Sequence, residues 1–224
     1  MRPFLSYLLS ASLIGAFFIS SPITPVSAQP LNQPIEPVSG MWQAPADALP
    51  LSNPGRIQAN APKGTVEVVE FFSYTCTHCA AFAPKLSAWY AQQPASVRLL
   101  YLPVSWRADM VASQRLFFTL LRLKRLDLHE QVFADYANDP EQLSTDGGVL
   151  NWALHHGFNK KTWLAAYHSA TVTQNMRATQ QAFHRFELNG VPTLVVNGRY
   201  ALIPSNQVLE TLDNVVQHEL TLTQ

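Results

Sequence analysis

The sequence predicts an α/β fold that is interrupted by a helical insertion. Two observations support this prediction. Residues 64–103 read as strand, helix, strand, because two short runs rich in β-branched and aromatic residues flank a segment with helical spacing. From about residue 108 to residue 186 the pattern changes to successive helices, before two short strands and a last helix. With 224 residues, 47% of them hydrophobic, the chain can bury a core for one domain with an insertion.

The first 28 residues have the layout of a secretory signal peptide. Arg2 precedes an apolar run from about residue 8 to residue 19, and small residues lead to a cleavage site expected after Ala28. An uncleaved membrane anchor is the alternative, but the run is short for a bilayer span. We therefore expect the mature protein to begin near Gln29, in a compartment where disulfides persist.

Residues 29–62 are rich in Pro, Asn, Ala and Ser and show little periodicity. They predict an extended leader with at most one short strand, around residues 55–59.

The α/β part is predicted in two halves. In the first half, residues 63–106, "GTVEVVEFFS" and "SVRLLYLPVS" are strands joined by a helix that starts at Cys76, which implies a parallel βαβ unit. Residues 107–186 form the helical insertion. In the second half, residues 187–224, "TLVVNGRYAL" is a hairpin with Asn-Gly at its turn, followed by a helix from about residue 205 to residue 219.

The charges exclude two classes of partner. Fifteen Lys and Arg residues balance fifteen Asp and Glu residues, so no basic excess points to nucleic acid or to an anionic membrane surface. Partners are expected to be met through apolar or main-chain contacts.

The two cysteines of the chain, Cys76 and Cys79, allow three interpretations. A structural disulfide would close too short a loop to remove much unfolded-state entropy. A closed zinc site needs four ligands and there is no second cysteine pair, although two thiolates could hold a soft copper ion. The third interpretation is a redox centre.

The redox interpretation fits the local physics best. A cysteine that follows a strand and opens a helix faces free backbone N–H groups and the positive end of the helix dipole, and both favour the thiolate. Cys76 is then the nucleophile and Cys79, one turn further in, is the resolving cysteine. His78 lies between them and can stabilise the sulfur anion further.

The stretches "VVEFFSYTCTHC" and "GVPTLVVNGRY" together resemble the thioredoxin-fold thiol oxidases of the bacterial periplasm, the DsbA type. The similarity runs from about residue 64 to the C-terminus and includes the insertion. It implies a thioredoxin fold with an inserted helical domain. It also implies that Val191-Pro192 forms a loop facing the cysteines with a cis proline, where the main chain of Val191 receives an extended substrate.

The resemblance also gives Glu70 a role. Strand alternation places Glu70 on the same face as Val66, Val68 and Phe72, and a solvated glutamate at the strand edge is the alternative. The family implies a buried acid with a raised pKa that exchanges the proton of Cys79. Leu100 is expected where the best-known members place a lysine near this acid.

Two further residues are candidates for contact with substrate. Tyr74 could rim a substrate groove, or its ring could simply pack. Thr77 replaces the proline that is commonest between the family's cysteines and retains a backbone N–H and a hydroxyl.

The expected function is donation of the Cys76–Cys79 disulfide to reduced, cysteine-containing exported proteins. The resemblance further implies a periplasmic location and reoxidation by a membrane oxidase of the DsbB type; we expect a monomer that needs no cofactor, metal or nucleic acid. The alternatives are a disulfide reductase or isomerase of the same fold, a copper(I) chaperone, and a chaperone that holds peptides without redox turnover. A dedicated dimerisation domain has no room in the leader, which disfavours an isomerase.

Overall fold

The structure, a computed structural model, describes residues 42–223. The predicted signal peptide, residues 1–28, and the first part of the leader therefore lie outside the described residues. In the part that is described, no helix is both long enough and apolar enough to cross a membrane.

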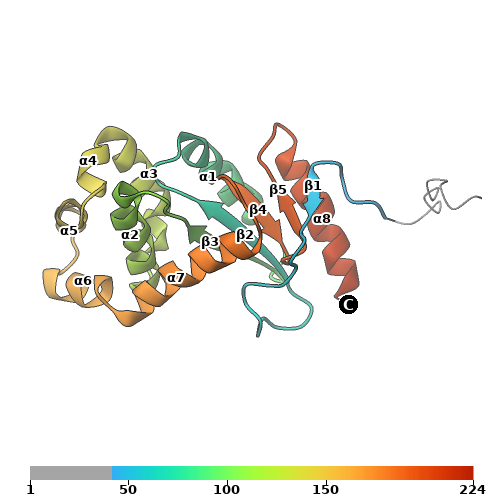
Figure 1. Cartoon of the computed structure of the whole chain (residues 1–224), viewed down its shortest axis with the longest axis horizontal. Coiled ribbons are helices and arrows are strands. Elements are labelled where there is room, and N and C mark those ends of the chain that lie inside the picture. Colours follow the sequence, from blue (N-terminus) through green and yellow to red (C-terminus); the bar gives the residue numbers. More distant parts are fainter. Residues whose placement is uncertain (1–41, 224) are drawn as a thin grey trace, which may run out of the picture. The chain divides into compact units, whose positions relative to one another are not determined.

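A mixed β-sheet forms the centre of the fold (Figure 1). Its strands in residues 42–223 are β1 Ala48–Pro50, β2 Val66–Phe72, β3 Val97–Pro103, β4 Thr193–Val196 and β5 Tyr200–Leu202. Their order across the sheet is β1-β5-β4-β2-β3. β2 and β3 are parallel and the other pairs are antiparallel, so the predicted βαβ unit and the predicted hairpin are both confirmed.

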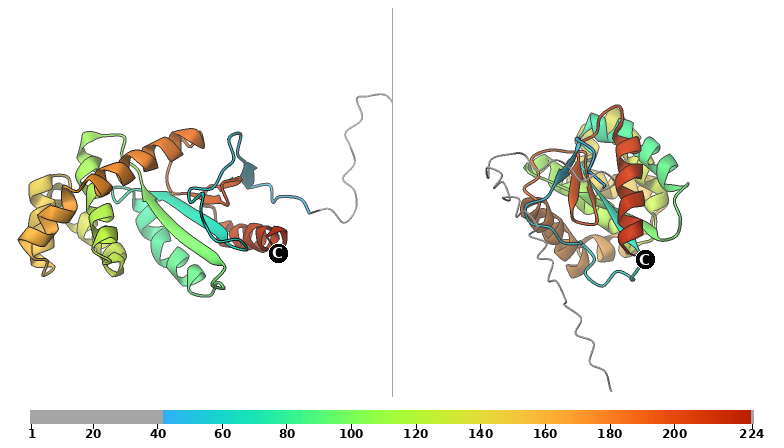
Figure 2. Two further views of the ribbon diagram at one scale, coloured as in Figure 1. Left: turned by 90° about the horizontal axis from the view of Figure 1, so that it is seen from below. Right: turned by 90° about the vertical axis from the view of Figure 1, so that its right-hand side faces the viewer.

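Helices cover both faces of the sheet. α1 Thr77–Tyr90 and α8 Val208–Leu222 pack on one face and α7 Ala170–Arg185 on the other, as the left view of Figure 2 shows. The remaining helices lie between β3 and α7 in the chain. They are η1 Ala108–Met110, α2 Val111–Arg122, η2 Leu126–Leu128, α3 His129–Asn138, α4 Pro140–Leu143, α5 Asp146–His155 and α6 Lys160–Tyr167. The predicted α/β class with a helical insertion is confirmed.

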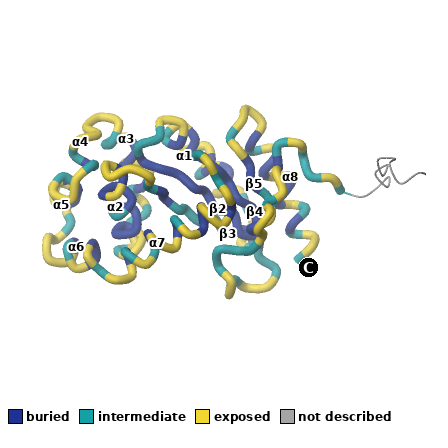
Figure 3. The backbone as a smooth tube through the Cα atoms, viewed as in Figure 1, coloured by how far each residue is buried: buried dark blue, intermediate teal, exposed yellow. Residues whose placement is uncertain are grey.

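β2 is covered along its whole length, and all seven of its residues are buried (Figure 3). Its alternation is as predicted: Val66 and Val68 pack in one core with α1 and α8, whereas Val69 and Phe71 pack in another with α7. Glu70 lies on the first of these two faces. Because β2 is covered on both sides, a polar side chain on it has no route to water.

The leader differs from the prediction. Residues 55–59 are not a strand; the strand of this region is β1, which pairs with β5. The amides of Ile57 and Gln58 instead donate to the carboxylate of Glu67, at 2.7 and 2.9 Å, and so are not free to pair with a strand. Gly55 donates to the carbonyl of Gly198 at 2.8 Å, in the hairpin turn.

The hairpin turn requires its glycine for two reasons. Asn197 and Gly198 both have positive φ, 52° and 64°, as a two-residue hairpin turn needs. A Cβ on Gly198 would also lie 2.1 Å from the carbonyl oxygen of Gly55. The turn thus fixes the β4–β5 hairpin, whose first strand is preceded by the Val191-Pro192 loop.

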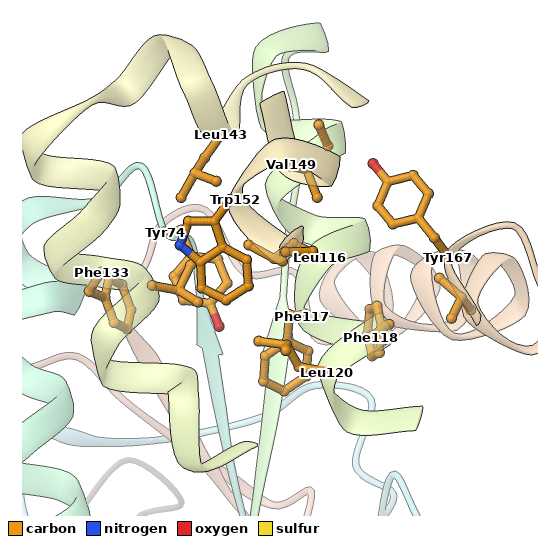
Figure 4. Close-up of a cluster of buried hydrophobic side chains, with 14 of the residues drawn as sticks. Tyr74, Leu116, Phe117, Phe118, Leu120, Phe133, Leu143, Val149, Trp152 and Tyr167 are labelled. Atoms are coloured by element: carbon orange, nitrogen blue, oxygen red, sulfur yellow. The ribbon is translucent and has the colours of Figure 1, made fainter. Parts of the chain in front are cut away.

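A third core joins the insertion to the active-site helix. Figure 4 shows aromatic and aliphatic side chains of the insertion in one cluster with Tyr74, which comes from the segment between β2 and α1. Cys79 and Ala83 of α1 belong to the same cluster. The insertion therefore packs directly against the residues that carry the cysteines.

Candidate active site

Cys76 is the N-cap residue of α1. Its backbone is extended (φ −99°, ψ 113°), and its Sγ accepts a hydrogen bond from the backbone N–H of Cys79 at 3.2 Å. A sulfur in this position takes the place of the side-chain oxygen that usually caps a helix. The helix terminus therefore supplies Cys76 with an N–H donor and with the positive end of its dipole, as predicted.

This environment acidifies Cys76. The thiol of Cys79 donates to its sulfur, which is the largest effect; the backbone N–H groups of Cys79 and His78 and the charge of His78 act in the same direction. Partial burial opposes them, but the pKa of Cys76 is lowered from 9.0 to about 6. At pH 7 a thiol with this pKa is about nine-tenths thiolate.

Cys79 has the opposite character. It is fully buried, and burial is the main reason why its pKa is raised far above the ordinary range of a thiol. Both cysteines are unbridged in the structure. The pair thus consists of one half-exposed, acidic sulfur and one buried sulfur that holds its proton, which is the division of roles predicted for attacking and resolving cysteines.

The Val191-Pro192 loop faces Cys76. Its peptide bond is cis, in the form that the resemblance implies, and the carbonyl oxygen of Val191 lies 3.6 Å from the Sγ of Cys76. Val191 is half-buried and Pro192 is buried. The main chain before the proline is therefore next to the sulfur that a substrate must reach.

Glu70 is buried beneath the cysteines, with 1% of its surface exposed. The solvated alternative is excluded. Burial, and to a smaller extent the charge of Cys76, raise the pKa of Glu70 from 4.5 to about 8. Neither carboxyl oxygen has a hydrogen-bond partner among residues 42–223. Its charge also contributes to the raised pKa of Cys79, so the two groups interact.

The residue facing Glu70 on the next strand is Tyr101, so the expectation for Leu100 is wrong. The register pairs Glu70 with Tyr101 and Val69 with Leu100. Paired residues in a parallel ladder lie on one face, and Leu100 accordingly packs with Val69 on the α7 side. An uncharged phenol stands where a cation would stabilise the carboxylate; the pKa of Tyr101 is itself raised to about 12, mainly by burial.

Thr77 and His78 occupy the first turn of α1 and both are exposed. His78 acts on Cys76 through its charge and its backbone N–H. Contact of Thr77 with a substrate stays a prediction.

Tyr74 does not rim a groove, and the expectation that it contacts substrate is corrected. Its ring is 3% exposed and packs in the core with the insertion, and its hydroxyl lies 2.8 Å from Nδ1 of His129. The residue is buried because its ring packs against Phe72 of β2 and against His129 and Phe133 of α3. The ring of Tyr74 therefore packs in the core, which is the other alternative.

His129 was not a candidate in the sequence. It is the first residue of α3, is 5% exposed, and has a pKa lowered to about 4 by burial. No local pattern marks it, because its partners come from β2, β3 and α2 and are distant in the chain.

Within residues 42–223 no group of three or more His, Cys, Asp or Glu side chains is placed to hold a metal ion. The two sulfurs form the reactive part of the site.

Comparison with known proteins agrees with this geometry. The DSBA-like thioredoxin domain model matches residues 67–217. The thiol:disulfide interchange protein DsbA of Bordetella pertussis is 29% identical over 197 residues, which cover 88% of this chain and 85% of that protein. The DsbA of Pseudomonas aeruginosa is 31% identical over 153 residues, or 68% of each chain.

Solved structures give the same result. The crystal structure of Pseudomonas aeruginosa DsbA superposes with a TM-score of 0.72 at 27% identity and covers 81% of this chain and 96% of that one. The oxidoreductase DsbA from Xylella fastidiosa superposes with a TM-score of 0.71 at 25% identity and covers 78% and 96%. The predicted thioredoxin fold is confirmed, and so is the resemblance drawn from the cysteine and proline motifs. The chain belongs to the DSBA-like thioredoxin domain family.

Proposed function

We propose that this thiol:disulfide oxidoreductase donates its Cys76–Cys79 disulfide to reduced exported proteins. The observation that carries the proposal is the asymmetry of the two sulfurs. An acidic Cys76 stabilises the reduced protein and makes its own sulfur a good leaving group, while the buried Cys79 keeps its proton.

The exchange proceeds in two displacements. A substrate thiolate attacks the Cys76 sulfur, the Cys76–Cys79 bond breaks, and the electron pair leaves on Cys79, which takes a proton from the carboxyl group of Glu70. A second substrate thiolate then attacks the substrate sulfur of the mixed disulfide and releases Cys76 as a thiolate. The substrate loses two electrons and the protein gains them.

The size of the redox effect follows from the acidity of Cys76. With a pKa of about 6, Cys76 is ionised at pH 7, and this ionisation stabilises the reduced protein by the equivalent of roughly one pKa unit. For a two-electron couple, that stabilisation corresponds to about 30 mV. Solvent screening reduces this value, because the thiol is half-exposed. Acidity therefore makes the disulfide a stronger oxidant.

The exchange involves two partners, the substrate and an oxidase. Val191, Pro192 and Thr77 receive an extended substrate beside Cys76, and a membrane oxidase of the DsbB type removes the two electrons. The signal peptide, residues 1–28, directs export of the protein to the periplasm. The exported protein acts as a monomer. Residues 63–106 and 187–224 form the thioredoxin-like domain that carries the exchange, and residues 107–186 form the insertion.

The test uses the oxidised protein and a reduced peptide with two cysteines. We expect the peptide to leave with a disulfide and the protein with two thiols, in equal amounts. Cys76→Ser and Cys79→Ser must each abolish the transfer, because neither variant can form the disulfide that is passed on. If Cys76 of Cys79→Ser is first joined to a small thiol in a mixed disulfide, the peptide thiolate should displace that small thiol and remain bound to Cys76. Glutathione-dependent reduction of a peptide disulfide without forward transfer would instead identify a reductase. Stoichiometric copper(I) retained against a chelator, with no transfer, would identify a chaperone.

A further inference from the structure

The segment that delivers Cys76 to the helix is held in two ways. Within the segment, the Ser73 hydroxyl and the Thr75 hydroxyl lie 3.0 Å apart, and the N–H of Cys76 donates to the carbonyl of Ser73 at 3.1 Å. These are local bonds at the rim of the site. The other attachment is the side chain of Tyr74, which leaves the segment and enters the core of the insertion (Figure 4).

Inside that core, the hydroxyl of Tyr74 has a single hydrogen-bond partner among the described residues. Its hydroxyl lies 2.8 Å from Nδ1 of His129, at the first position of α3. The other ring nitrogen, Nε2, is buried and has no hydrogen-bond partner in residues 42–223. A buried hydroxyl without an acceptor is unfavourable, so this bond determines where the tyrosine lies.

His129 suits this task because a neutral imidazole can form a hydrogen bond with the hydroxyl without bringing a charge. Aromatic rings surround the imidazole, with centroids at 4.9 Å for Phe72, 4.7 Å for Tyr101 and 5.6 Å for Phe117. The pKa of His129 is lowered to about 4, so the ring is neutral near pH 7. A neutral ring that accepts at Nδ1 carries its proton on Nε2.

The hydrogen-bonded pair of Tyr74 and His129 also lies close to Glu70. Burial, and to a smaller extent the charge of Glu70, raise the pKa values of both Tyr74 and Tyr101, and His129 contacts both rings. The titratable groups close to this histidine include the two phenols, each neutral near pH 7, and both Glu70 and the neighbouring Glu130 act on Tyr101. A cation at this place would favour ionisation of Glu70, whereas a neutral imidazole leaves its pKa raised.

We propose that His129 is a positioning residue for thiol exchange: its Nδ1 accepts the hydroxyl of Tyr74 and thereby fixes the segment that places Cys76 at the N-terminus of α1. The insertion thus acts on the chemistry of the cysteines through one hydrogen bond. The inference rests on the proposed function, since the positioned sulfur is the one that exchanges.

The test measures the acidity of Cys76 in variants that lose this bond. Tyr74→Phe removes one oxygen atom and keeps the ring. His129→Leu removes the acceptor, and His129→Asn restores an acceptor close to the position of Nδ1. Thiolate absorbance gives the pKa of Cys76, a small disulfide gives the exchange rate, and denaturant unfolding gives the stability of each variant.

We expect Tyr74→Phe and His129→Leu each to decrease the acid dissociation constant of Cys76 by roughly twofold to tenfold, the range for one lost hydrogen bond. The reason is that a loosened segment aligns Sγ less well with the N–H donors of the helix. The double variant should lose no more than either single variant, because both remove the same interaction. His129→Asn should recover part of the loss.

Tyr167→Phe is the matched control. Tyr167 is also a buried tyrosine of the hydrophobic core, and its hydroxyl donates to Asp146 at 2.6 Å, but both residues lie in the insertion. This variant should lose stability and leave Cys76 unchanged.

The inference is overturned if Tyr74→Phe loses stability as Tyr167→Phe does, while the pKa and the exchange rate of Cys76 stay as in the wild type. Tyr74→Phe decides the question even if His129→Leu does not fold. These readouts do not depend on the direction of electron flow. A reducing potential in the wild type would thus refute the proposed oxidase and leave this inference standing.

Discussion

Replacement of Glu70 by glutamine should remove a large pH dependence from the stability of the protein. Burial raises the pKa of Glu70 from 4.5 to about 8, so the folded protein retains a proton that the unfolded chain releases. The stabilising contribution is complete below pH 4.5 and is lost as the pH rises through about 8. A shift of 3.5 units at about 1.4 kcal/mol each amounts to roughly 5 kcal/mol at most.

The assay is denaturant unfolding at several pH values between 4.5 and 8. Both proteins carry Cys76→Ser, because the lowered pKa of Cys76 would otherwise add stability as the pH rises above about 6. The stability of the Glu70 protein should fall relative to that of Glu70→Gln by several kcal/mol across this range. Parallel curves would refute the argument, because they would mean that the carboxyl group is not held protonated.

The same substitution tests the catalytic role in the protein with both cysteines. Glutamine cannot supply a proton to Cys79 as it leaves the disulfide, so formation of the mixed disulfide should slow by roughly 100-fold, at the low end for a positioned acid or base. Glu67→Gln is the control, since Glu67 is also a buried glutamate of β2 but binds the backbone amides of Ile57 and Gln58. Unchanged exchange kinetics in Glu70→Gln from about pH 5 to pH 8 would exclude this role.

Three further predictions concern the same site. Alkylation of Cys76 should follow an ionisation with a midpoint near pH 6; a midpoint near 9 would contradict the assigned hydrogen bonds. His78→Ala should raise this midpoint by less than about one pH unit, because the imidazole is exposed and its charge is screened. Tyr101→Lys should lower the pKa of Glu70 by about one to three units, as measured by carbon NMR of the carboxyl group. An unchanged value there would mean that the facing residue on β3 has been misassigned.

Local patterns in the sequence predicted most of the fold. The period of two along β2 identified the face that carries Glu70, and Asn197-Gly198 identified the hairpin because that turn needs two positive φ angles. The roles of the two cysteines were also predictable, since the lowered pKa of Cys76 arises from groups in the first turn of its own helix. In each case the residues that decide the structure are neighbours in the chain.

The errors arose where distant segments meet. The expectation for Leu100 is wrong because one residue of register changes the face of a strand, and only the paired sheet shows that Tyr101 faces Glu70. For a similar reason the sequence does not decide between a groove and packing for Tyr74 and does not mark His129: their hydrogen bond joins residues 55 positions apart. The strand expected at residues 55–59 failed because the carboxylate of Glu67 takes the amides that a strand would need.

The reduction potential of the Cys76–Cys79 pair tests the central claim most directly. The purified mature protein is equilibrated in glutathione buffers, and its oxidised and reduced forms are quantified. Among thioredoxin-fold proteins, a strongly oxidising DsbA has a potential of about −120 mV and thioredoxin about −270 mV. A value toward the first is predicted here, because the helix terminus and His78 stabilise the reduced form. A value toward the second would contradict the account and identify a reductase.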